Sequence, residues 1–432
     1  MSKQLWNKGI DPDKMIEDFT VGNDRNLDLR LARYDVQGSI AHVRMLNKIG
    51  IISDDELSKL IPALQEILST IEQGDFKIEE GIEDVHSQVE FILTEKLGET
   101  GKKIHSGRSR NDQVLVDLKL FFRDEMKLLA GEVKTLFLTL QNLSEKYKDY
   151  LMPGYTHMQI AMPSSFGLWF GAYAETLTDD MLTIVAAYKI SNRNPLGSAA
   201  GYGSSFPLDR EMTTRLLEFE SPNYNVIAAQ MSRGKTEKAV ANAIAAVAST
   251  VGHFAMDICL WMCNNFGFVS FPDELTTGSS IMPHKKNPDV FEIIRGKCNR
   301  LQSIPNELAL LTSNLPLGYN RDLQLMKDIL FGPLNDLKEC LKMTDFMLQH
   351  IKIKENILDN SLYDYIFTVE DVNRMVNQGI PFRDAYRKVG IDVKEGKYKP
   401  SREINHTHLG SIGNLTTEAI RKRMNNIMEE IR

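Results

Sequence analysis

Long intervals without proline constrain the fold of this chain more than any other feature of its sequence. No proline occurs in residues 63–152, 223–271 or 334–380. A proline inside a helix removes a backbone hydrogen bond and clashes with the preceding turn. Intervals of this length therefore permit helices much longer than those of an average globular protein.

The residues inside these intervals have the spacing of helices. Between Asp112 and Tyr150, apolar residues recur every three or four positions, which is the period of an amphipathic helix. Residues 236–266 are rich in alanine, the strongest helix former. We find no convincing segment with the alternation typical of a strand. The sequence therefore predicts an all-α protein with long central helices.

Turn-rich segments separate the predicted helices and suggest three regions. A chain of 432 residues is long enough for several domains. We predict an N-terminal helical domain over residues 1–107, a central long-helix bundle domain over 108–355, and a small C-terminal helical domain over 356–432. The turn-rich segments are residues 152–157, 194–207, 272–288 and 315–319.

Charge and hydropathy exclude several classes of protein. The net charge is −7 and the chain has no basic stripe, so we expect no nucleic-acid partner. The apolar stretch 239–263 contains Asn242, His253 and Asp257, which do not suit a lipid-facing helix, so we expect no membrane contact. The beginning of the chain is polar and its four cysteines form no CxxC pair, which favours the reducing cytoplasm.

Three sequence segments have part of a metal-binding or cofactor-binding motif, but none of these motifs is complete. Residues 234–236 end like a phosphate-binding loop, but the required first glycine falls at Ala229. The glycine-rich residues 197–203 lack a preceding strand, which a dinucleotide fingerprint needs. His406 and His408 have no evident third ligand. The sequence therefore predicts no metal and no cofactor.

The segment Gly278–Asp289 is the strongest candidate for chemistry. It combines two hydroxyls, Ser279 and Ser280, with Lys285 and Asn287, just before a predicted helix over residues 290–301. A helix start presents free N–H groups and the positive end of a dipole. With a lysine, these groups can hold a carboxylate and the negative charge that develops when its α-carbon loses a proton. A plain helix cap needs only one serine and no lysine.

Two other segments can supply catalytic or binding groups. His157 lies beside Thr156 in a turn between long helices, where a histidine suits proton transfer, although a lone histidine is more often structural. Residues 108–113 contain Arg108, Ser109, Arg110 and Asn111 at the start of a long helix. Two arginines at a helix start form a carboxylate clamp, or else a capped helix with arginines facing solvent.

Together these segments resemble the fumarase/aspartase superfamily. Its GSSxMPxKxNP pattern is intact at residues 278–288, and residues 108–113, 285–289 and 319–324 are similar to the argininosuccinate lyases in particular. Residues 84–86 and 195–198 also resemble family segments. The resemblance covers residues 15–330. It implies a superfamily fold whose long helices form a bundle on tetramerisation, and cleavage of argininosuccinate into arginine and fumarate, the last step of arginine biosynthesis.

The resemblance also implies roles for individual residues. Ser279 would be the general base, while Lys285 and Asn287 would stabilise the dianionic intermediate. His157, oriented by Glu292, would protonate the leaving nitrogen. The substrate would be bound by Ser109, Arg110, Asn111, Thr156, Arg233, Tyr319, Gln324 and Lys327.

The length of the predicted helix constrains how these residues can meet. A helix from residue 108 to about Lys148 is more than about 50 Å long at ~1.5 Å per residue. His157 lies just beyond one end of it and Asn111 lies at the other. A single small substrate can touch both only if they come from different chains of a symmetric oligomer. The resemblance implies the same arrangement, a homotetramer whose sites each draw on three chains.

Three departures from the family pattern leave alternatives open. Residues 23–25 replace a usual serine-containing segment, Met162 replaces a usual glutamine and Met326 a usual aspartate. We expect these changes around the amino-acid half of the substrate. They keep open a sister lyase that acts on a modified argininosuccinate or on adenylosuccinate. A structural relative without activity is a further alternative, although Ser279 and His157 argue against it.

Overall fold

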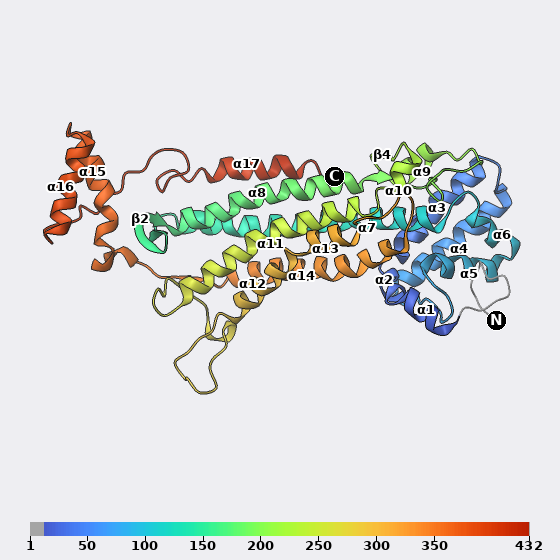
Figure 1. Ribbon diagram of the computed structural model, residues 1–432, viewed down its shortest axis with the longest axis horizontal. Coiled ribbons are helices and arrows are strands. Elements are labelled where there is room, and N and C mark those ends of the chain that lie inside the picture. Colours follow the sequence, from blue (N-terminus) through green and yellow to red (C-terminus); the bar gives the residue numbers. More distant parts are fainter. Residues whose placement is uncertain (1–12, 432) are drawn as a thin grey trace.

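The computed structural model describes residues 13–431 and is built almost entirely of helices (Figure 1). This confirms the predicted all-α class. The molecule is elongated, with long helices along its main axis and shorter helices at both ends.

The N-terminal helices surround a hydrophobic core of their own at one end of the molecule. Leu46 of α3, Leu64 of α4 and Leu93 of α5 are fully buried in this core. Ser53 begins α4 with a capping box, in which its side chain and that of Glu56 each accept from the other's backbone N–H. The helices are α1 (Lys14–Val21), α2 (Asp24–Asp28), α3 (Ala32–Lys48), α4 (Asp54–Glu72), α5 (Val85–Leu97), α6 (Glu99–Lys102) and η1 (Lys103–His105).

The central helices form the long body and confirm the two principal helices expected from the sequence. The expected helix over 112–150 is α7 (Arg110–Lys146), and the one over 236–266 is α11 (Lys235–Met262). Both pack against α8 in one continuous core. The remaining central elements are α8 (Phe166–Ser191), α9 (Arg210–Leu216), α10 (Val226–Gln230), α12 (Asp289–Leu301), α13 (Ile304–Leu311), η3 (Arg321–Leu325) and α14 (Met326–Leu348).

Helix α11 is long and apolar enough to cross a membrane by length and composition alone. In the structure it packs against α8, α12 and α14, and more than half of its most apolar stretch is buried inside the protein. A helix that is apolar on most of its surface also suits the interior of a large bundle.

Two prolines lie inside helices, although a proline removes a backbone hydrogen bond there. Pro62 lies within α4 and Pro333 within α14. Each is flanked by leucines that are fully buried, Leu60 and Leu64 around Pro62, and Leu330 and Leu334 around Pro333. Burial of these leucines offsets the hydrogen bond that each proline removes.

A β-hairpin occupies residues 151–165, so the expectation of no convincing strands was wrong here. β1 (Leu151–Thr156) pairs antiparallel with β2 (Gln159–Ser165). Tyr155 packs against the rings of Trp261 and Phe266, which fixes the hairpin on the end of α11. Such tertiary packing overrides weak local strand preference. The other strands are β3 (Arg193–Asn194) with β4 (Ser221–Pro222), and β5 (Val269–Ser270) with β6 (Lys352–Ile353).

The C-terminal region contributes to two different cores. Helices α15 (Thr368–Asn377) and α16 (Phe382–Lys394) bury a small cluster of their own at one end of the molecule. Helix α17 (Thr417–Met428) returns along α8 and joins the main core (Figure 1). The division into three domains stays a prediction, and α17 packs with the central helices rather than with α15 and α16. Two short helices, η4 (Ile357–Asp359) and η5 (Ser361–Phe367), precede α15.

Candidate active site

A cavity at the N-terminal end of α7 collects six of the eight predicted substrate-binding residues. Its volume is about 170 Å³. It is lined by residues of α2, α5, α7 and α14 and by the segments before α11 and α14. The six predicted residues are Arg110, Asn111, Arg233, Tyr319, Gln324 and Lys327. Segments separated by more than 200 residues thus meet at one place.

Lys327 forms the most buried ion pair of this cavity. Its Nζ lies 2.6 Å from Asp28 Oδ1 and 2.7 Å from Asp24 Oδ1, and only 4% of its side chain is exposed. Burial disfavours the ammonium form, but Asp28 and Asp24 outweigh it and raise the pKa of Lys327. Burial also raises the pKa of Asp24 to about 6, against the attraction of Lys327. The cavity therefore contains a fixed cation and an acid that titrates near neutral pH.

Arg233 and Gln324 are held by the segments around them. Arg233 Nη2 donates to the carbonyl of Leu323 at 2.7 Å, and its Nε lies 3.0 Å from Glu237 Oε1. This second contact has the distance of an ion pair but not the angle of a hydrogen bond. Gln324 Nε2 donates to the carbonyls of Thr20 and Val21. These hydrogen bonds hold the side chains of Arg233 and Gln324 in place in the wall of the cavity.

The predicted arginine clamp at the start of α7 is not formed as expected. Arg108 is buried and donates to Ser39 Oγ at 3.0 Å, so it faces the interior. Arg110 lines the cavity but already donates to Glu83 and to Ser87. Ser109 caps α7 by accepting from the backbone N–H of Asn111. Of this segment, Asn111 has the side chain best placed for a ligand, since its side chain makes no hydrogen bond in the described part of the chain.

Several residues that line the cavity were not predicted as site residues, and His86 and Asp28 are the most buried of the charged ones. His86 Nδ1 lies 2.7 Å from Asp35 Oδ1 and 3.6 Å from Asp117 Oδ2, and all three side chains are buried. Burial disfavours the imidazolium, but Asp35 and Asp117 outweigh it and raise the pKa of His86 to about 10. The three could hold a metal ion by spacing alone. With this raised pKa the imidazole of His86 is protonated at neutral pH, so its contacts with the two carboxylates are ion pairs.

His157 and Thr156 lie at the opposite end of the chain's long axis from this cavity. His157 and Met158 form the two-residue turn of the β1–β2 hairpin, with φ of 53° and 60°. A turn with positive φ at both central positions normally carries asparagine or glycine, so these side chains are held in an unfavourable conformation. Strain of this kind often marks functional positions. The turn presents the exposed His157 side chain at the tip of the hairpin.

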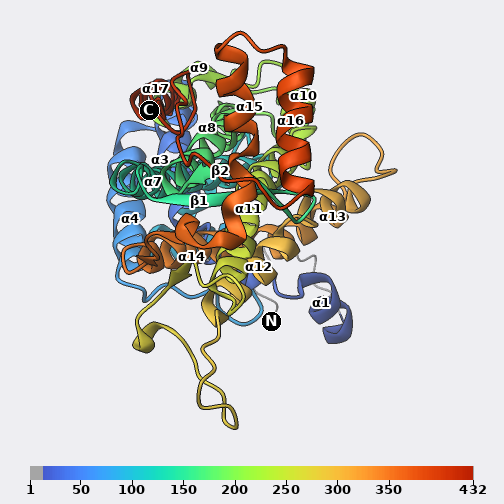
Figure 2. The ribbon, with the colours of Figure 1, turned by 90° about the vertical axis from the view of Figure 1, so that its left-hand side faces the viewer.

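Ser279 lies in the segment between α11 and α12, which extends away from the helices (Figures 1 and 2). Its Oγ accepts hydrogen bonds from the backbone N–H groups of Met282 at 3.1 Å and Ile281 at 3.3 Å. Two donors directed at one hydroxyl oxygen stabilise a negative charge on that oxygen. Ser279 is half-buried, whereas the neighbouring Ser280 is exposed.

The other predicted catalytic residues lie on or near the same segment. Asn287 Nδ2 donates to the carbonyl of Gly278 at 3.3 Å, which ties the two ends of the segment together. Lys285 is exposed, and Lys286 pairs instead with Asp273. Glu292 is exposed in the first turn of α12. In the described residues, no hydrogen bond or ion pair joins Glu292 to His157.

One chain therefore presents three separate groups of predicted residues. The cavity holds six, the hairpin tip holds His157 and Thr156, and the 278–292 segment holds four, namely Ser279, Lys285, Asn287 and Glu292. The remaining one, Ser109, caps α7 next to the cavity. Helix α7 has 37 residues, so it separates the cavity from the hairpin by about 55 Å at ~1.5 Å per residue. The assignment of these residues to one site stays a prediction.

Comparison with known proteins identifies the family. A family model described as Lyase matches residues 8–303. The argininosuccinate lyase of Phocaeicola vulgatus is 58% identical over 429 residues, which cover 99% of this chain and 96% of that protein. The chain belongs to the argininosuccinate lyase family. A more distant argininosuccinate lyase, from Thermotoga neapolitana, is 40% identical over 389 residues and covers 90% of this chain and 98% of its own.

Solved structures confirm the fold of this argininosuccinate lyase family member. An EDDS lyase in complex with formate matches with a TM-score of 0.76 at 20% identity, covering 98% of this chain and 91% of that one. A class II fumarase from Schistosoma mansoni matches with a TM-score of 0.72 at 16% identity, covering 96% and 93%. At this identity the likeness establishes the fold alone.

Only one of the three departures from the argininosuccinate lyase pattern faces the cavity. Asp24 lines it and pairs with Lys327. Met326 is 1% exposed and belongs to the main hydrophobic core, so the expectation that it lies beside the substrate was wrong. Met162 lies on β2, with the hairpin. Asn23 and Arg25 bond to Asp328 and Glu17, outside the cavity.

Proposed function

We propose that the chain cleaves argininosuccinate to arginine and fumarate by general acid–base elimination, without a metal or a cofactor. The observation that carries the proposal is the cavity in which Arg110, Asn111, Arg233, Tyr319, Gln324 and Lys327 meet in a member of the argininosuccinate lyase family. Cations and amides in one small cavity suit a substrate that has several carboxylates.

Ser279 takes the proton from the carbon next to a carboxylate of the succinyl half. A serine hydroxyl is a weak base, so its oxygen must be stabilised as an anion. The N–H groups of Ile281 and Met282 already donate to Oγ, which supports this role. Lys285 and Asn287 stabilise the second negative charge that the carboxylate gains when the proton leaves.

His157 completes the reaction by protonating the nitrogen of the departing guanidino group. The C–N bond then breaks, and fumarate and arginine are the products. Glu292 orients the imidazole and favours its charged form, as a carboxylate does beside a histidine. Because His157 is at an exposed hairpin tip, it can be inserted into the site of another chain.

We propose further that the protein is a cytoplasmic homotetramer whose sites draw on three chains. The cavity, the hairpin and the 278–292 segment are separate within one chain, which supports sharing between chains. Apolar side chains on the outer surface of α12 and α14 also support association, since Ile293 is 63% exposed and Met343 and Phe346 are each 44% exposed.

The reaction is tested by fumarate release from purified protein. We expect fumarate to form from argininosuccinate at the same rate with and without a metal chelator, because no proposed step uses a metal. Absorbance of fumarate measures the rate directly. Loss of activity with chelator, or fumarate formed from adenylosuccinate but not from argininosuccinate, contradicts the proposal.

Asp24→Ala tests the role of the cavity wall. We expect KM to rise roughly tenfold and kcat to fall less, since Asp24 binds the cationic amino-acid half rather than the reacting carbons. The pKa of Asp24 is about 6, so the wild-type KM should also rise as the pH falls below 6 and the carboxylate is protonated. The variant should lack this rise.

The matched control is Asp18→Ala, which removes the same charge from the exposed surface of α1. Its KM should equal that of the wild type. Equal KM values and equal pH dependence for Asp24→Ala and the wild type would mean that Asp24 serves only to hold Lys327.

A further inference from the structure

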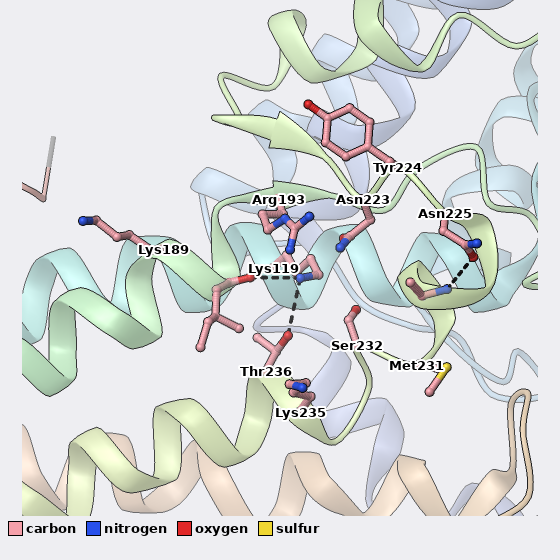
Figure 3. A pocket seen from close by; sticks show the side chains of 12 residues that line it. Lys119, Lys189, Arg193, Asn223, Tyr224, Asn225, Met231, Ser232, Lys235 and Thr236 are labelled. Atoms are coloured by element: carbon pink, nitrogen blue, oxygen red, sulfur yellow. Dashed lines mark hydrogen bonds between the residues drawn. The ribbon is translucent and has the colours of Figure 1, made fainter.

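A second cavity, of about 600 Å³, lies between α7, the end of α8 and the start of α11 (Figure 3). It is separate from the candidate active site, although the segment before α11 borders both, with Arg233 in one and Ser232 in the other. None of the proposed catalytic or substrate-binding residues lines it.

Lys119 of α7 forms the floor of this cavity. The residue is only 2% exposed, and its Nζ donates to the carbonyl of Ile190 at 3.1 Å and to Thr236 Oγ1 at 3.4 Å (Figure 3). Both acceptors are neutral. An ammonium group has three protons, so a third donor is available toward the cavity.

No carboxylate neutralises this buried lysine by direct contact in the described residues. Glu237, the acid whose charge acts on Lys119, is occupied by the backbone N–H of Gly234 and by Arg233. Burial lowers the pKa of Lys119 to about 8, with Glu237 acting against this effect and Arg193 adding to it. A buried cation without a bonded counter-ion is costly, and an anionic ligand would remove that cost.

Other groups in the cavity also suit an anion. Arg193 and Lys235 are exposed at the rim, and neither makes an ion pair in the part of the chain that the structure describes. Asn223 is 6% exposed, and its Oδ1 is buried without a hydrogen-bond partner. A rotation of the amide by 180° would present its NH₂ donor instead. No aspartate or glutamate lines the cavity.

Part of the wall is apolar. Ile190, Ala228 and Met231 line one part of the cavity, and the ring of Tyr224 is 77% exposed at its edge. A ligand that filled this volume would therefore have a charged end and an apolar or aromatic body. Lys189 also lines the cavity but pairs with Glu430. The other three cations and the amide offer more donors than one carboxylate can accept. A phosphate group carries a charge near −2 and accepts from several donors at once.

We propose that this cavity binds a phosphate monoester with an apolar or aromatic body, with its phosphate on Lys119 and Arg193 and its body against Met231 and Tyr224. The site lies outside the catalytic machinery, so binding there and the proposed reaction are tested separately.

The test is calorimetric titration of the full-length protein with phenyl phosphate, inorganic phosphate and benzoate. We expect saturable binding of phenyl phosphate that is tighter than that of inorganic phosphate, because the phenyl ring buries apolar surface, and tighter than that of benzoate. Lys119→Met and Arg193→Gln should each weaken the binding of phenyl phosphate at least roughly tenfold, the scale of a lost hydrogen bond to a charged group.

The matched control is Lys134→Gln, which removes a positive charge from the same helix α7 outside the cavity. This variant should bind as the wild type does, and all three variants should release fumarate at the wild-type rate. If Lys119→Met does not fold, Arg193→Gln decides, since Arg193 is exposed. No saturable binding to the wild type, binding unchanged in Arg193→Gln, or benzoate binding as tightly as phenyl phosphate contradicts the proposal.

Discussion

Ser279→Ala is expected to fold normally and to lower kcat at least roughly a hundred-fold, the usual contribution of a general acid–base group. The reason is local. Ser279 Oγ is the oxygen that accepts from the N–H groups of Ile281 and Met282, so it is the oxygen in this segment whose anion is stabilised. These hydrogen bonds lie within an exposed segment, so we expect their loss to leave the helical core unchanged.

Ser280→Ala is the matched control, because it removes the same hydroxyl one residue along the segment. Ser280 is exposed and its side chain makes no hydrogen bond in the described residues, so we expect kcat within a few-fold of the wild type. Steady-state fumarate release measures both, and thermal unfolding checks that both variants fold. A larger loss for Ser280→Ala than for Ser279→Ala would show that the base is wrongly assigned.

The long helices could be predicted because their signals are local. The apolar period of α7 and the alanine content of α11 are properties of neighbouring residues. Both helices begin and end within a few residues of the expected positions. The hairpin at residues 151–165 could not be predicted in this way, because its packing depends on Trp261 and Phe266, a hundred residues away.

The cavity was predicted in part, and the pattern of success has a physical reason. Asn111, Tyr319 and Lys327 were identified because their segments resemble a family, not because anything local shows that they meet. His86 and Asp28 were missed because their role comes from burial beside other charges, which only the fold determines. Arg108 was misjudged for the same reason, since nothing in the sequence shows that it turns toward Ser39.

The proposed sharing of active sites between chains rests on the positions of two residues. Asn111 lines the cavity at the start of α7, whereas His157 is at the hairpin tip beyond the other end of that helix. Asn111→Leu and His157→Asn should therefore each be nearly inactive, for different reasons. Asn111→Leu damages the cavity of its own chain, and His157→Asn damages the group that the chain contributes to another site.

The most direct test of this claim is to refold the two inactive variants together and to measure fumarate release from the mixed oligomers. In a symmetric assembly with random mixing, up to roughly a quarter of the sites receive the intact cavity from one chain and the intact hairpin from another. We predict that activity returns to about that fraction of the wild-type rate. Mixed oligomers that have formed, as shown by mass spectrometry, yet stay inactive would contradict the claim that one active site takes Asn111 and His157 from different chains.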